Sequence, residues 1–99
     1  MKRLLVLATM VALAGAATTD RAEYMFFNRH LNRTWLDSAY DMLAAAHAAD
    51  PTDEHCLYLW SRIHIQKGDD AKTKGDKLAY FGRAKALAES LIALNDKND

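Results

Sequence analysis

The chain has 99 residues, of which 51% are hydrophobic, with four glycines, one proline and one cysteine. This length allows one small domain, and the scarcity of Gly and Pro beside many Ala, Leu and Lys residues indicates helices rather than strands. Thirteen basic and 13 acidic residues cancel, so the charge balance argues against nucleic-acid binding. The lone cysteine, Cys56, excludes an internal disulfide.

The amino terminus has the pattern of a secretory signal peptide. Lys2-Arg3 supplies a positive start, Leu4–Leu13 is an apolar run, and Ala14–Ala16 offers small residues for cleavage. We therefore predict a signal peptide over residues 1–16 and export across the inner membrane to the periplasm. The apolar run is shorter than the about 20 residues that span a bilayer, so no stable membrane span is expected after cleavage.

The remaining residues 17–99 are predicted to form two antiparallel helix pairs, with unit boundaries at about 20–53 and 54–99. In the first pair, a helix is expected over Glu23–Leu31 with Asp20 as its cap. The next helix is expected over Trp35–Ala49, with Thr34 as cap, because apolar residues recur at intervals of three and four. Asp50-Pro51 ends it, since the residue before proline avoids helical geometry.

In the second pair, a helix is expected from a cap at Thr52 or Asp53 to about Gln66, with Gly68 as a left-handed stop. The polar stretch Asp69–Asp76 is predicted to be an exposed loop, and the last helix to run over Lys77–Leu94. The residues expected to face inward on this last helix are Leu78, Phe81, Ala84, Ala88 and Leu91, broadened by Leu87, Ile92 and Leu94.

Several positions of these pairs resemble the tetratricopeptide repeat, a helix pair that recurs about every 34 residues. The small, bulky and proline positions of the second helix match Ala39, Leu43, Ala46 and Pro51. The first-helix positions of the next repeat match Leu57, Trp60, Ser61 and His64. About eleven residues more than the motif allows then precede Ala84, Ala88 and Leu91, which are similar to its second helix.

The long inter-helix segment and the sequence Lys77–Ala88 are similar to exported repeat proteins related to the T-component of tripartite ATP-independent periplasmic transporters. The repeat region of regulator-of-microtubule-dynamics proteins is similar as well. This resemblance implies an α-solenoid fragment whose first helices line a concave binding groove. The predicted groove positions are Arg21, Tyr24, Asn28 and Leu31 in one unit, and His55, Tyr58, Arg62 and Ile65 in the other.

These groove residues combine rigid aromatic area with a guanidinium that binds carboxylates, which suits a peptide or an anionic ligand. Ordinary half-exposed helix residues have the same composition, so both interpretations stay open. Two repeat units leave apolar stack ends, which self-association, partner docking or a truncated gene product would each explain.

Neither catalysis nor a cofactor is predicted. His30, His55 and His64 lack the spacing of a helical metal site, and the sequence has no HExxH or CxxC motif. Neighbouring His55 and Cys56 point about 100° apart on a helix and do not form a nucleophile–base pair. Calcium binding at Asp69 is disfavoured because lysines interrupt the acidic loop.

The predicted function is therefore a non-catalytic periplasmic module that binds a protein or peptide. The alternative is a ligand-binding or accessory subunit associated with a solute transporter.

Overall fold

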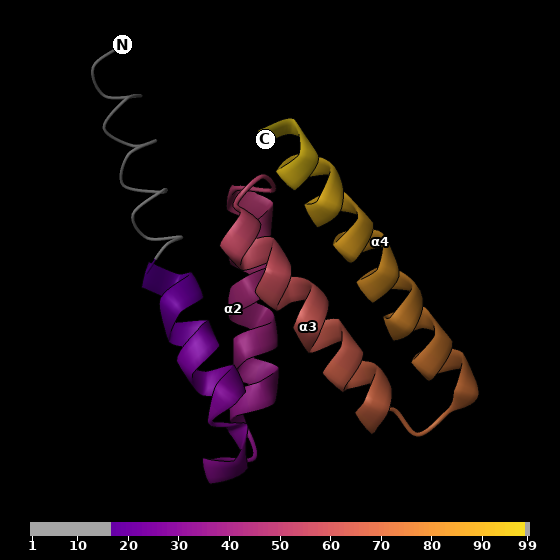
Figure 1. The fold of residues 1–99 in the computed structure, drawn as a ribbon. Helices are drawn as coiled ribbons and strands as arrows, with labels where there is room; N and C mark the ends of the chain where they lie inside the picture. The colour runs from indigo at the N-terminus through magenta and orange to yellow at the C-terminus, as the bar shows by residue number, and fades with distance from the viewer. Residues whose placement is uncertain (1–16, 99) are drawn as a thin grey trace. The chain divides into compact units, whose positions relative to one another are not determined.

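The computed structural model describes residues 17–98, which form helices and no strand, and this confirms the predicted all-α class. A first helix over 17–27 is followed by the short 3-10 helix η1 (Arg29–Leu31) and by the α-helices of Figure 1. These are α2 (Trp35–Ala49), α3 (Glu54–Asp70) and α4 (Lys74–Asn98). The chain divides into two compact units between Pro51 and Thr52. The predicted signal peptide, residues 1–16, lies outside the described residues.

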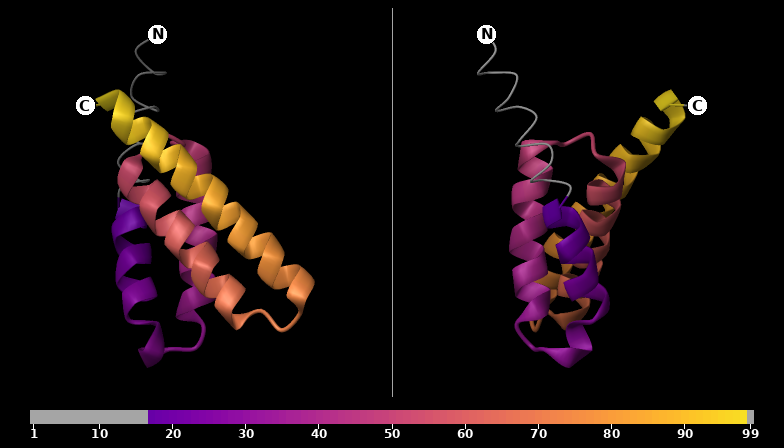
Figure 2. Two further views of the ribbon diagram at one scale, coloured as in Figure 1. Left: turned by 45° about the vertical axis from the view of Figure 1, so that its right-hand side comes forward. Right: turned by 90° about the vertical axis from the view of Figure 1, so that its left-hand side faces the viewer.

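Unit 1 is an antiparallel pair of the first helix and α2, as the views of Figures 1 and 2 agree. Each helix carries one stripe of buried residues spaced three or four apart. The stripes consist of Thr19, Ala22 and Phe26 on the first helix and Ala39, Leu43 and Ala46 on α2. The rings of Tyr24 and Trp35, 5.9 Å apart, join the two helices near their turn. The bounds predicted for α2 are confirmed.

The first helix begins and ends earlier than predicted. It is already helical at Ala17, so Asp20 lies inside the helix and does not cap it. The buried Thr19 lies on the same face as Ala22 and Phe26, so the buried stripe begins before the predicted cap, Asp20. At the other end, both the backbone N–H and the side-chain amide of Asn28 donate to the carbonyl of Tyr24, at 3.0 and 2.8 Å. The backbone bond still has the i→i−4 spacing of an α-helix, whereas the bond from the Leu31 N–H to the Asn28 carbonyl, at 2.9 Å, spans three residues and belongs to η1, so the α-helix ends before the predicted Leu31.

Asp53 and Thr34 were both predicted to cap a helix, but only one of them makes capping hydrogen bonds with its side chain. Asp53 Oδ1 accepts hydrogen bonds from the N–H groups of His55 and Cys56, at 3.1 and 3.2 Å, which confirms it as the cap of α3. Thr34 occupies the cap position of α2 but makes no capping bond with its side chain. Its hydroxyl donates instead to Asn32 Oδ1, at 2.9 Å, and so belongs to the turn.

We expect Asp53→Ala to lower the free energy of unfolding by about 1 kcal/mol, because two N–H groups at the start of α3 lose their acceptor. The matched Thr34→Ala should lower it by less than about 0.5 kcal/mol, since no capping bond is lost. Urea denaturation followed by circular dichroism measures both. Equal losses would contradict the assignment of Asp53 as the stronger cap.

Unit 2 is an antiparallel hairpin of α3 and α4, joined by residues 71–73 (Figure 2). The predicted loop over Asp69–Asp76 is therefore wrong, since helix replaces most of it. The predicted left-handed stop at Gly68 is wrong too, because no described glycine has a positive φ and α3 continues to Asp70.

Side-chain hydrogen bonds stabilise the end of α3 and the start of α4, on either side of the connection. Lys77 Nζ donates to the carbonyls of Gly68 and Asp69, at 3.3 and 3.1 Å, and so binds the carboxyl end of α3. Thr73 Oγ1 accepts the N–H of Asp76 at 3.1 Å and caps the first turn of α4. A threonine three residues before an aspartate is a recognisable start signal for a helix. It places the start of α4 earlier than the predicted Lys77.

The face that α4 turns toward α3 agrees with the prediction in part, since Leu87, Ala88 and Leu94 are half-buried as expected. Ala84 is buried, and Tyr80 and Leu91 are half-buried, as their spacing on one face requires. Leu78 and Ile92, which were expected to face inward, are each 61% exposed. Each of these two residues directly follows a residue that is half-buried against α3. Successive residues of a helix point about 100° apart, so Leu78 and Ile92 point away from α3. Two large apolar side chains of α4 are therefore left in solvent within unit 2.

Candidate binding surface

Six of the eight predicted groove residues form two triplets, one in each unit. Arg21 and Tyr24 lie on the first helix, and Asn28 follows its last residue. His55, Tyr58 and Arg62 all lie on α3. Each triplet is a feature of its own unit.

In unit 1 the triplet is only partly available to a ligand. Tyr24 is 59% exposed, with one edge against Trp35, and Arg21 is exposed as well. The amide nitrogen of Asn28 is occupied with the carbonyl of Tyr24, and Leu31 belongs to η1 rather than to the helix. Asn28 therefore ends a helix, a role that its sequence position alone does not reveal.

In unit 2 the predicted residues form a continuous exposed row, which we call the α3 stripe: His55, Tyr58, Arg62 and Ile65. Their spacing of three, four and three places them on one face of α3. Tyr58 is 41% and Ile65 45% exposed. The stripe thus offers an aromatic ring, a guanidinium, an imidazole and an aliphatic side chain side by side.

The side chains of Arg62 and Tyr58 are linked by a hydrogen bond and a cation–π contact. Arg62 Nη1 donates to the Tyr58 hydroxyl at 2.8 Å, and the guanidinium carbon lies 5.7 Å from the centre of the Tyr58 ring. A side chain that is ordered before binding loses less conformational entropy when a ligand arrives. The pair therefore gives the α3 stripe a preorganised cation beside an aromatic surface.

His64 lies on the other side of α3, where it is fully buried. Its Nδ1 lies 2.7 Å from the carbonyl oxygen of Trp60, and its ring lies edge-on to the Trp60 indole with centroids 4.3 Å apart. Because a carbonyl oxygen only accepts, Nδ1 carries the proton in this bond. His64 thus acts as a packed and oriented core residue.

The arrangement of the other reactive groups does not add a chemical site within the part of the chain that the structure describes. Residues 17–98 contain no group of three or more His, Cys, Asp or Glu side chains that could hold a metal ion. The Cys56 thiol is buried, whereas the neighbouring His55 is exposed. Asp70 Oδ1 accepts from Gln66 Nε2 at 3.1 Å, so this carboxylate of the predicted loop belongs to the end of α3.

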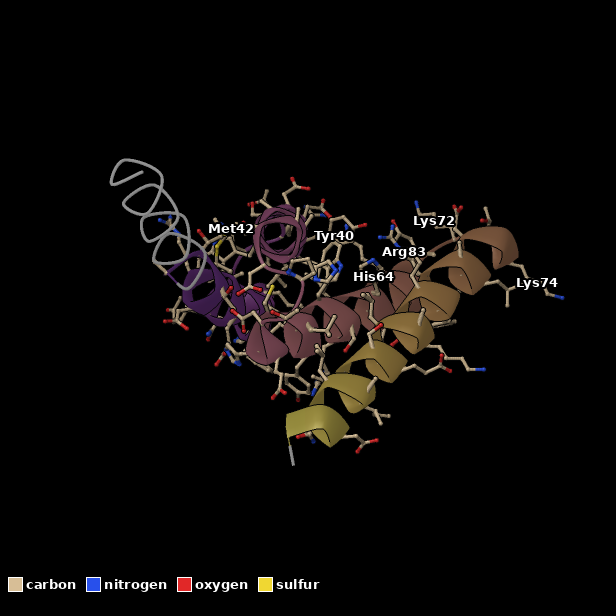
Figure 3. All side chains as sticks on the ribbon, turned by 90° about the horizontal axis from the view of Figure 1, so that it is seen from above. Tyr40, Met42, His64, Lys72, Lys74 and Arg83 are labelled. Carbon is tan, nitrogen blue, oxygen red and sulfur yellow. The ribbon has the colours of Figure 1, made fainter. Side chains whose placement is uncertain are left out.

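Basic side chains gather at the other end of unit 2. Lys72 extends from the α3–α4 connection, and Lys74 and Arg83 extend from α4 (Figure 3); all three are exposed. None of the three lies on the α3 stripe. Among the described helices, none combines the length and apolarity that crossing a membrane requires.

Comparisons with known protein families, with curated proteins and with solved structures found no match to this chain. The resemblance to tetratricopeptide repeats and to the transporter-related proteins therefore stays a prediction from the residues quoted above.

Proposed function

We propose that this chain is a non-catalytic, exported module of the tetratricopeptide type that binds a protein or peptide through the α3 stripe. The observation that carries the proposal is the exposed Tyr58–Arg62 pair, ordered by its own hydrogen bond. Export to the periplasm rests on the signal-like residues 1–16.

The composition of the stripe indicates which ligand it suits. Arg62 favours a carboxylate, and Tyr58 and Ile65 supply apolar area on both sides of it in sequence. A peptide with an acidic side chain or terminal carboxylate next to an aliphatic or aromatic residue meets both requirements. A helix with side chains on one face presents them in a row, which suits an extended or helical peptide.

The test is a peptide array of this composition, followed by fluorescence anisotropy on the best binders. We expect Tyr58→Ala and Arg62→Ala each to weaken binding about tenfold or more, because each removes one half of the ordered pair. Lys72→Ala is the matched control, since Lys72 is exposed but lies in the α3–α4 connection. It should leave the affinity unchanged.

Two outcomes would contradict the proposal. One is peptide binding that is the same in all three variants. The other is the absence of peptide binding together with a rise in melting temperature when small carboxylic acids are added, which would favour the transporter-associated, ligand-binding alternative.

A further inference from the structure

Along α4, one exposed row of residues has the spacing of a coiled-coil seam. It begins at Leu78 and ends at Asp96, with intervals that alternate between four and three residues. Its six members, all exposed, are Leu78, Gly82, Lys85, Glu89, Ile92 and Asp96. We call this row the α4 seam. It contains the two 61%-exposed apolar side chains of α4, Leu78 and Ile92, and lies away from the side that faces α3.

From the charges and shapes along the α4 seam, we propose that it binds the α4 seam of a second copy of this chain, with the two helices antiparallel. In a two-fold arrangement centred near residue 87, each position of one copy meets a fixed position of the other. Lys85 then lies opposite Glu89 of the second copy, Gly82 opposite Ile92, and Leu78 opposite Asp96. By symmetry each of these contacts occurs twice.

The charges select the antiparallel orientation. A parallel, in-register pair would place Lys85 against Lys85 and Glu89 against Glu89, which is repulsive at the centre of the contact. The antiparallel pair converts both repulsions into opposite-charge contacts. The α4 seam has no other charged residue except Asp96 at its end, so this one pairing decides the direction.

The sizes of the side chains along the α4 seam favour the same antiparallel pairing, in which Gly82 meets Ile92. A Cβ atom added at Gly82 would meet no atom within 4 Å, so the surface there is open and lacks a side chain. Ile92 of the second copy would lie over this opening, which lets two helices approach closely. Ala86 and Ala93 beside the seam are small as well, and both are exposed. The projecting Ile92 and the open surface at Gly82 therefore make the inner part of the α4 seam complementary to itself.

The helix α4 is long enough to form the contact between the two copies. At about 1.5 Å per residue, its 25 residues span about 37 Å, compared with about 26 Å for the 17 residues of α3. One helix from each copy forms a small interface, below the about 1,200 Å² at which stable dimers begin. The dimer is therefore expected to dissociate on dilution, and its contact differs from the α3 stripe that binds peptide.

The experiment measures molecular mass by light scattering and sedimentation over a concentration series of the mature chain. We expect a monomer at low concentration and a dimer at high concentration. Lys85→Glu alone and Glu89→Lys alone should each weaken the dimer about tenfold or more, because each places like charges opposite one another. The double variant K85E/E89K should return to within about threefold of the original dissociation constant.

A mixture separates contact between copies from effects within one helix. Lys85→Glu and Glu89→Lys chains, each weak alone, should form a mixed dimer when combined, because both pairs between positions 85 and 89 then have opposite charges. Ile92→Asp should abolish the dimer without unfolding the chain, since Ile92 is mostly exposed in one copy. Arg83→Glu reverses an exposed charge of α4 outside the seam and should leave the dissociation constant unchanged.

The proposal is overturned if the chain stays monomeric at all concentrations. It is also overturned if the two single variants fail to associate when mixed, or if Arg83→Glu weakens the dimer as much as Lys85→Glu. Circular dichroism of each variant verifies that the helices remain folded.

Discussion

Replacing Trp60 by alanine is expected to lower the free energy of unfolding by about 3–5 kcal/mol, the largest loss that we predict for a single change. Trp60 is only 4% exposed and packs edge-on against the buried His64 ring. Removal of the indole therefore leaves a cavity and takes away the surface on which His64 rests. A domain of this size is stable by only about 5 kcal/mol or somewhat more, so the variant approaches complete unfolding.

Tyr58→Ala is the matched control for this change. Tyr58 lies two residues earlier on the same helix, but it is 41% exposed and makes its hydrogen bond to Arg62 on the surface. We expect a loss of about 1 kcal/mol or less. Denaturant unfolding followed by far-ultraviolet circular dichroism compares the two, because the remaining Trp35 complicates fluorescence. Similar losses in both variants would mean that the buried side of α3 is assigned to the wrong face.

Gly68→Val is expected to lower the free energy of unfolding by about 1–3 kcal/mol, although valine is the better helix former. A Cβ atom at Gly68 would lie 2.5 and 2.7 Å from two ring atoms of Phe81, closer than atoms approach without a shift. The Phe81 ring of α4 thus packs directly on the backbone of α3. A β-branched side chain at this position has to displace the ring.

A second glycine and a double variant test this reason. Gly75→Val, in the first turn of α4, meets open space and should change stability by no more than about 0.5 kcal/mol. In a Phe81→Ala background, Gly68→Val should lose most of its effect, since the ring with which it collides is absent. If the effect of Gly68→Val is the same with and without Phe81, then helix propensity or another contact is responsible.

The local signals in the sequence predicted several elements well. The bounds of α2 follow from Pro51 at its end and from the three-and-four spacing of Ala39, Leu43 and Ala46. Asp53 was one of two capping candidates, and its carboxylate makes the predicted bonds. The groove positions from His55 to Ile65 came from the resemblance to tetratricopeptide repeats; they are exposed on α3, and their role in a groove stays a prediction. The bounds of α2 and the cap at Asp53 depend on residues within about two turns of one another.

Features that depend on contacts between helices were predicted less well. Lys67-Gly68 is the pattern of a helix end, yet the Phe81 ring covers Gly68 and Lys77 donates to the carbonyls of Gly68 and Asp69. These contacts come from residues eight to thirteen positions away in sequence, which a local pattern does not include. The hydrogen bonds of Asn28 and Thr34 belong to the turn of unit 1, and helical periodicity does not encode them.

By itself, the sequence determined that this protein is all-α and where α2 lies. These properties follow from residue spacing and from short-range capping. Only the tertiary structure decided how wide the packed side of α4 is, because α4 has apolar residues on more than one face and its periodicity permits several orientations. Packing around Tyr80, Ala84 and Leu91 selected one face. That choice left Leu78 and Ile92 exposed, since a single helix cannot bury every side against one neighbour.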